Sequence, residues 1–304
     1  MIKTLGKILG LLALAGIGLL VWGFSPGVLP VGAAPVFALP AATPPPEMKF
    51  STLSAGHMMA QAMMAYRGGA MGDERSFAMG GVLVQHPQVT LLFDTGFGRN
   101  VDQHVLTTPV LMQKTSKYFK ETAVADQLNG LKLDGIVLTH AHWDHVSGIE
   151  DLPDVPVWIN AAEEAFIKSG NPHTALIRSF SNVNYKLYDY SDGPYLGFER
   201  SLDVFKDGSV VLVPAVGHTP GSTIAFIATP DGKRYALLGD LVWQKEGLDL
   251  PAERPWLPRT LADDDPAAVR ALIVRMHHIQ NALPITMVPA HDQRVWDALP
   301  KFAG

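Results

Sequence analysis

The chain has 304 residues, of which 47% are hydrophobic and 17% are charged, and its formal net charge at pH 7 is −5. It has no cluster of Lys and Arg that could follow a phosphate backbone, so nucleic acid is not expected as a partner. The complete absence of cysteine excludes disulfides, thiolate metal ligands and a cysteine nucleophile.

Residues 1–24 are typical of a signal peptide or a membrane anchor. Lys3 and Lys7 flank the start of an uncharged apolar stretch from Ile8 to Phe24, and export signals share this order of charged and apolar residues. The length of the stretch lies between the apolar core of a cleaved signal and a full bilayer span. Its Leu-rich run favours an uncleaved anchor, and small residues between 33 and 38 leave cleavage open.

Residues 25–46 are rich in Pro and Ala and end in three consecutive prolines. Proline favours extended backbone, so this segment is predicted to be a tether. The chain is expected to be exported, either into a bacterial periplasm or anchored through its N-terminal segment to the inner membrane and facing the periplasm. Residues 47–304 contain no further Pro- or Ser-rich linker and are predicted to form one domain.

The motif Thr139-His140-Ala141-His142-Trp143-Asp144-His145 follows an apolar run, 135–138, that is predicted to be a buried strand. His140 and His142 are two residues apart in an extended segment, so their side chains point to the same side. Asp144 and His145 would come from the turn that follows. Three imidazoles and a carboxylate in six positions indicate a metal site, with zinc as the first choice and manganese, iron or cobalt as alternatives.

Three later apolar runs end in the same way, with a His or an Asp just after a predicted strand. The runs are 210–213, 235–238 and 285–288, and the residues that follow them are His218, Asp240 and His291. Open α/β sheets place their ligand sites at the carboxyl ends of strands. We therefore expect these side chains to meet those of the first motif.

Two helices are predicted from capping residues. Asn160 can cap a helix over residues 161–169, with Glu163 at the capping-box position. Asp265, which precedes a proline, starts a second helix whose apolar stripe is expected to cover the outer face of a sheet.

Taken in order, HxHxDH at 140–145, GHTPGS at 217–222, LLGD at 237–240 and PAHD at 289–292 resemble the motifs of the metallo-β-lactamase-fold hydrolase superfamily. Phe93-Asp94-Thr95-Gly96 resembles the early Asp-Thr-Gly of that family, and the similarity extends over about residues 50–295. The resemblance implies an α+β fold, an αβ/βα four-layer sandwich of two mixed β-sheets flanked by helices. It also implies a small-molecule substrate.

The resemblance further assigns the ligands of two divalent metal ions. His140, His142 and His218 would hold one ion, Asp144, His145 and His291 the other, and Asp240 would bridge them. Asp94 would orient a ligand imidazole without binding metal itself. Such a pair of ions supplies metal-bound hydroxide for attack on an ester-like bond. Asp144 and Asp240 would be the catalytic carboxylates, with Asp144 as the proton shuttle.

Within the superfamily the pattern is most similar to the lactonase and organophosphate-hydrolase branch, so the expected substrate is a lactone, an ester or an organophosphate. Quorum-signal lactonases carry a Tyr three residues after the bridging Asp, where this chain has Trp243. This departure weighs against acyl-homoserine lactones. Thioester hydrolysis and mononuclear-iron persulfide oxidation are the alternative functions of the same fold, and the sequence gives no information on oligomeric state.

Trp143 and Trp243 neighbour the ligands in sequence and are predicted to line an apolar substrate pocket. A Pro-rich loop that includes Trp256 would either close over this pocket or pack onto the core. The methionines between residues 58 and 71 are predicted to form an adaptable apolar face and not a copper site. The other histidines are expected to be structural or solvent-exposed, and these are His57, His86, His104, His173, His277 and His278.

Overall fold

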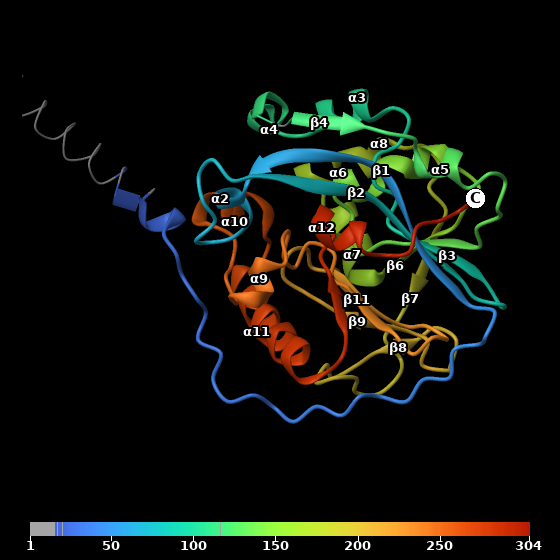
Figure 1. Cartoon of the computed structure of the whole chain (residues 1–304). Helices are drawn as coiled ribbons and strands as arrows, with labels where there is room; N and C mark the ends of the chain where they lie inside the picture. The colour runs from blue at the N-terminus through green and yellow to red at the C-terminus, as the bar shows by residue number, and fades with distance from the viewer. Residues whose placement is uncertain (1–15, 17, 20, 116) are drawn as a thin grey trace, which may run out of the picture.

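Two mixed β-sheets pack against each other between layers of helices in the computed structural model of the chain, which describes residues 16, 18–19, 21–115 and 117–304 (Figure 1). The larger sheet has the strand order β4-β1-β2-β3-β5-β6-β7, and the smaller has the order β12-β11-β10-β9-β8. In the larger sheet, β3, β5, β6 and β7 run parallel, whereas β1 pairs antiparallel with β2 and β4, and β2 with β3. In the smaller sheet, β11 and β12 are parallel and the other pairs are antiparallel.

The elements are short, apart from one hairpin and one helix. The strands are β1 (Lys49–Gln61), β2 (Glu74–Gln85), β3 (Thr90–Phe93), β4 (Lys117–Lys120), β5 (Gly135–Val137), β6 (Val157–Asn160), β7 (Tyr185–Tyr188), β8 (Leu202–Asp203), β9 (Val210–Pro214), β10 (Thr223–Ala228), β11 (Arg234–Leu237) and β12 (Thr286–Val288). The helices are α2 (Ala62–Ala65), α3 (Val101–His104), η1 (Val105–Thr107), α4 (Val110–Thr115), α5 (Val124–Gln127), α6 (Trp143–Val146), η2 (Ser147–Asp151), α7 (Ala161–Lys168), η3 (Pro172–Thr174), α8 (Ala175–Ser179), α9 (Glu246–Asp249), α10 (Trp256–Ala262), α11 (Pro266–Ala282) and α12 (Gln293–Asp297).

Strand alternation divides the core into layers. On β9, Val210 and Leu212 lie in the apolar cluster between the two sheets. Val211 and Val213 point the other way, into the cluster that the smaller sheet shares with Ile273 of α11, because successive side chains in a strand face opposite sides. A third cluster lies between the larger sheet and its helices. The predicted four-layer α+β fold is therefore confirmed.

The strands predicted ahead of the metal motifs are present as β5, β9, β11 and β12, within one or two residues of the predicted bounds. β9, β11 and β12 run in one direction, so their carboxyl ends lie at one edge of the smaller sheet. The main-chain N–H of Thr223 donates to the carbonyl of Thr139 at 2.9 Å and joins this edge to the end of β5. The ligand-bearing loops therefore start from neighbouring points.

The predicted tether, residues 25–46, is a docked strap that runs along the surface past α11 and β8 to β1 (Figure 1). Leu29 N–H donates to the carbonyl of Pro251 at 2.8 Å, and Thr43 N–H to that of Asp207 at 2.8 Å. His278 Nε2 lies 2.6 Å from the carbonyl of Val31. Leu29 and Phe37 pack on the outer cluster of the smaller sheet, so this stretch is held by both hydrogen bonds and apolar contacts.

The predicted anchor from Ile8 to Phe24 falls largely outside the described residues, since 1–15, 17 and 20 are not among them. Within the described part of the chain, every helix is too short or too polar to cross a bilayer.

Removal of the strap is expected to lower the thermal stability of the domain. A chain that begins at Glu47 loses the three hydrogen bonds above, each worth about 1 kcal/mol net, together with the packing of Leu29 and Phe37. Its melting temperature should fall by roughly 6 °C or more, at about 2–4 °C per kcal/mol for a domain of this size. Calorimetry beside a chain that begins at Ser25 makes the measurement, and equal melting temperatures would mean that the strap is not docked in solution.

Candidate metal centre

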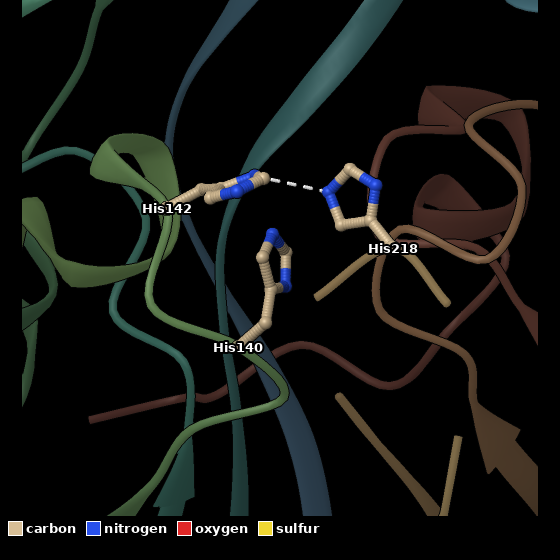
Figure 2. Close-up of side chains that lie close together, drawn as sticks. All are labelled: His140, His142 and His218. Atoms are coloured by element: carbon tan, nitrogen blue, oxygen red, sulfur yellow. Dashed lines mark hydrogen bonds between the residues drawn. The ribbon is translucent and has the colours of Figure 1, made fainter. Parts of the chain in front are cut away.

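Three imidazoles from two loops point toward one another beyond the ends of β5 and β9 (Figure 2). His140 and His142 lie between β5 and α6, and His218 lies between β9 and β10. The ring centroid of His218 is 4.6 Å from that of His140 and 4.6 Å from that of His142. Nε2 of His218 is 3.0 Å from Nδ1 of His142. The spacing lets one atom from each ring contact a single metal ion.

Asp240 joins this group to a second one that contains Asp144, His145 and His291. Its Oδ1 lies 3.1 Å from Nε2 of His145 and 2.9 Å from Nε2 of His291. His291 Nε2 is also 3.4 Å from Oδ2 of Asp144. The other oxygen of Asp240, Oδ2, is 3.4 Å from Nε2 of His218. The structure thus brings together all seven residues that the sequence predicted as ligands.

Burial keeps two of these rings neutral. His140 is 1% exposed, and its Nε2 has no hydrogen-bond partner among the described residues. Burial lowers the pKa of His140 and of His142 well below the usual value, and neutral imidazole is the form that binds metals. Because an unpaired buried nitrogen is costly, a cation beside His140 would remove a penalty that the protein alone leaves in place.

Asp240 and Asp94 make the other side of the centre attractive to positive charge. Burial alone would lower the pKa of His145. The carboxylates of Asp94 and Asp240 outweigh burial, so the pKa of His145 is raised well above its ordinary value. Burial would raise the pKa of Asp240, yet His291 and His145 hold it well below the usual range. Imidazole and carboxylate donors without thiolates suit zinc, and also manganese, iron or cobalt, so the residues present fit a metal centre.

Three of the imidazoles are held from behind by an oxygen that accepts from Nδ1. The pairs are Asp94 with His145 (2.8 Å), Asp263 with His218 (2.9 Å) and the carbonyl of Ala78 with His291 (2.9 Å). Such acceptors fix the ring orientation and leave Nε2 free for a metal. Asp94 has the orienting place predicted for it and also accepts from Thr139 N–H at 2.8 Å. Asp263 lies in a loop without a motif, and sequence reasoning misses it.

Arg254 connects the Pro-rich loop to the centre. Its side chain is buried, forms an ion pair with Asp263 and donates to the carbonyl of Asp240 at 2.7 Å. Its guanidinium carbon lies 5.0 Å from the centroid of the Trp243 ring. Leu248, earlier in the same loop, is buried in the outer core. The loop therefore packs on the core, and its Arg254 also supports residues beside the candidate ligands.

Glu163 joins the two loops of Figure 2. Its Oε1 accepts from Ala141 N–H at 2.6 Å, and Oε2 accepts from the Thr219 hydroxyl at 2.7 Å and from Gly221 N–H at 3.0 Å. Asn160 caps α7 as predicted, but the capping-box role of Glu163 is wrong, because its side chain turns inward to these donors. Burial raises the pKa of Glu163 to about 7, against the hydrogen bonds that lower it.

One prediction for the residues near the candidate ligands needs a correction. Trp143 is 6% exposed and stacks on Phe97, with ring centroids 5.6 Å apart, so it belongs to the core and does not line an open pocket. His173, predicted to be structural or exposed, is half-buried on η3 with its ring centroid 5.1 Å from that of His142. Trp243 is half-buried, and its indole N–H donates to Oδ2 of Asp240 at 2.7 Å.

Comparison with known proteins gives one family. A family model described as the metallo-beta-lactamase superfamily matches residues 81–291. A probable metallo-hydrolase of Mycobacterium tuberculosis is 30% identical over 203 residues, which cover 59% of this chain and 61% of that protein. A probable metallo-hydrolase of Bacillus subtilis is 30% identical over 124 residues, or 37% of this chain and 46% of that protein. The match to this chain thus spans about three fifths of the mycobacterial relative and less than half of the other.

Solved structures share the fold at low sequence identity. An N-acyl homoserine lactone hydrolase with N-hexanoyl-L-homoserine bound at its catalytic metal centre has a TM-score of 0.66 and 19% identity, and the match covers 84% of this chain and 97% of that one. The dizinc quorum-quenching lactonase AidC has a TM-score of 0.55 and 17% identity over 83% of this chain and 90% of its own. The hydrolase AbOPH has a TM-score of 0.53 and 18% identity over 83% of this chain and 89% of its own.

The substitution Glu163→Gln is expected to weaken zinc binding to the protein. The amide nitrogen cannot accept the bonds from Thr219 and Gly221, so the loop that carries His218 loses its support, and changes behind metal ligands typically cost about 10–100-fold in affinity. Competition with a chromophoric chelator measures the effect. Glu164→Gln is the matched control, because Glu164 lies on the surface of the same helix and pairs with Lys168. Equal zinc affinity in the two variants would contradict the role of Glu163.

Proposed function

The chain belongs to the metallo-β-lactamase superfamily, and on that premise we propose that it is a metal-dependent hydrolase that holds two divalent ions, with zinc as the first choice. The observation that carries the proposal is the meeting of seven His and Asp side chains from four separate loops, with Asp240 among them at the centre. The buried Nε2 of His140 has no hydrogen-bond partner among the described residues. This supports the proposal, because a metal ion would give that nitrogen a partner.

Two sets of residues would hold the ions. One set is His140, His142 and His218, the other is Asp144, His145 and His291, and Asp240 would serve both. When bound, such ions lower the pKa of water and polarise an ester or phosphoryl oxygen. The protein contributes the orientation of the imidazoles through Asp94, Asp263 and the carbonyl of Ala78.

Asp144 is the proposed proton carrier. It lies in the first turn of α6 and is half-buried, whereas the five candidate ligand histidines and Asp240 are buried. A carboxylate with partial access to solvent can take up a proton and pass it to a leaving group, as general acid–base catalysis requires. Its distance of 3.4 Å from His291 keeps it beside the reacting centre.

The proposed substrate is a small ester-like molecule, in particular a lactone or an organophosphate. The support comes from the shared fold with a lactone hydrolase, a dizinc lactonase and AbOPH and from the metallo-hydrolase names of the curated relatives. The Tyr of quorum-signal lactonases is replaced by Trp243, whose N–H is already donated to Asp240. This neutral donor is unsuited to protonate a leaving group. In the proposed mechanism Asp144 is therefore the acid, and Trp243 is not.

The test is acid release by the zinc-loaded full chain from a panel of lactones, aryl esters, phosphotriesters, thioesters and β-lactams. Lactones or phosphotriesters should be turned over fastest. Asp240→Asn should reduce that turnover at least about 10³-fold, because the amide cannot supply the negative charge that two cations share, and the bound zinc measured by elemental analysis should fall with it.

Asp297→Asn is the control variant, since Asp297 lies on α12 and its carboxylate bonds Gln293 on the surface. Full activity after removal of the metal with a chelator would contradict the mechanism. A panel in which thioesters lead, or in which only the iron-loaded protein reacts and consumes oxygen, would contradict the proposed substrate class.

A further inference from the structure

We propose that one corner of the catalytic domain rests on a lipid bilayer and thereby places the metal centre beside the membrane surface. The corner consists of residues 19 and 21–26, the turn 66–72 after α2, and helix α10. This inference is independent of which bond the centre hydrolyses.

Arg67 fixes the N-terminal segment to the corner. Its Nε donates to the carbonyl of Ser25 at 3.0 Å, and its Nη2 donates to the carbonyl of Trp22 at 3.3 Å and to the hydroxyl of Ser25 at 3.2 Å. The guanidinium also lies over the ring of Trp22, 5.5 Å from its centroid. Gly68, the residue after Arg67, lies against Pro26. A Cβ added to Gly68 would be 3.5 Å from Cβ of the proline.

Helix α10 closes the corner from the other side. A Cβ added to Gly23 would lie 2.9 Å from Cβ of Trp256, so the N-terminal segment and the first turn of α10 are in close contact. In Figure 1 the blue ribbon before the strap lies on the same side of the domain as α2 and α10. The three parts of the corner therefore form one packed surface.

Large apolar side chains on this surface are open to solvent. The exposed fractions are 46% for Leu19, 66% for Val21, 56% for Trp22, 81% for Met71 and 52% for Leu261. Exposed apolar residues that gather in one place mark an interaction surface. An exposed Trp such as Trp22 suits the interface of a membrane, where its amphipathic ring lies at the level of the headgroups.

The chain that leads into the corner identifies the occupant as lipid. From Ile8 to Phe24 the sequence has no charged residue, and Lys3 and Lys7 stand at its start. An apolar segment of this kind enters or lies in a bilayer. Because Arg67 holds its end against the domain, a bilayer that takes up this segment also meets Met71 and α10.

The same helix leads to the metal centre. Asp263, the residue after α10, accepts from His218 at 2.9 Å. A helix rises 1.5 Å per residue, so Trp256 and Asp263 are about 10 Å apart along its axis. A membrane against the corner therefore lies close enough to deliver a lipophilic substrate to the centre.

Nitroxide labels on the full chain test the proposal, and the absence of native cysteine makes single-site labelling direct. Met71→Cys and Leu261→Cys report on the corner, and Leu187→Cys on β7, 51% exposed, is the matched control. With vesicles of phosphatidylglycerol and phosphatidylcholine, the two corner labels should relax several-fold faster with oxygen than with a polar paramagnetic chelate. The control label should keep the ratio that it has in water.

Two results would overturn the proposal. In one, the protein does not bind the vesicles. In the other, it binds and both corner labels keep their aqueous ratio, which means that the N-terminal segment holds the membrane while the domain stays clear of it. Met71→Glu adds a second measurement, since a charge at the surface of the corner should lower vesicle partitioning several-fold and leave the hydrolysis of a water-soluble substrate unchanged.

Discussion

The centre depends on a single buried carboxylate. Asp240 follows β11 and contacts imidazoles from the loops after β5, β9 and β12. An isolated carboxylate in this place would be neutral, because burial opposes its charge. His145 and His291 keep it ionised, and it in turn favours the charged form of both rings. The loops are therefore drawn to one point by mutual electrostatic attraction as well as by the strands that end there.

Rigid support behind the ligands preserves this arrangement. The oxygen acceptors on His145, His218 and His291 come from three different parts of the chain, so each ring is fixed independently. Glu163 adds a link of another kind, because it binds main-chain and hydroxyl donors next to ligands in both loops. Such links limit the motion of imidazoles that repel one another when protonated, and they prepare the site before a metal arrives.

Sequence patterns predict the elements and residues of this protein that have a local signature in the sequence. Apolar runs followed by His or Asp place β5, β9, β11 and β12 and the seven candidate ligands, because strand ends and metal-binding motifs both have a local signature. The patterns fail where a residue acts at long range. Glu163 and Asp263 look like a helix cap and a loop acid until the fold brings them to Thr219 and His218. The prediction for Trp143 fails because the sequence does not show which way the first turn of α6 faces. The docking of residues 25–46 is not visible in the sequence either, because their partners, such as Pro251 and Asp207, are more than 150 residues away.

The segment from Arg254 to Asp263 performs two tasks at once. It supports His218 and Asp240 from inside, and it presents Leu261 to the outside. Directed evolution toward a new substrate would tend to alter such a bordering loop, yet each change there risks loosening a candidate metal ligand. Selection for altered specificity should therefore keep this segment and accumulate substitutions in loops that do not support the candidate ligands.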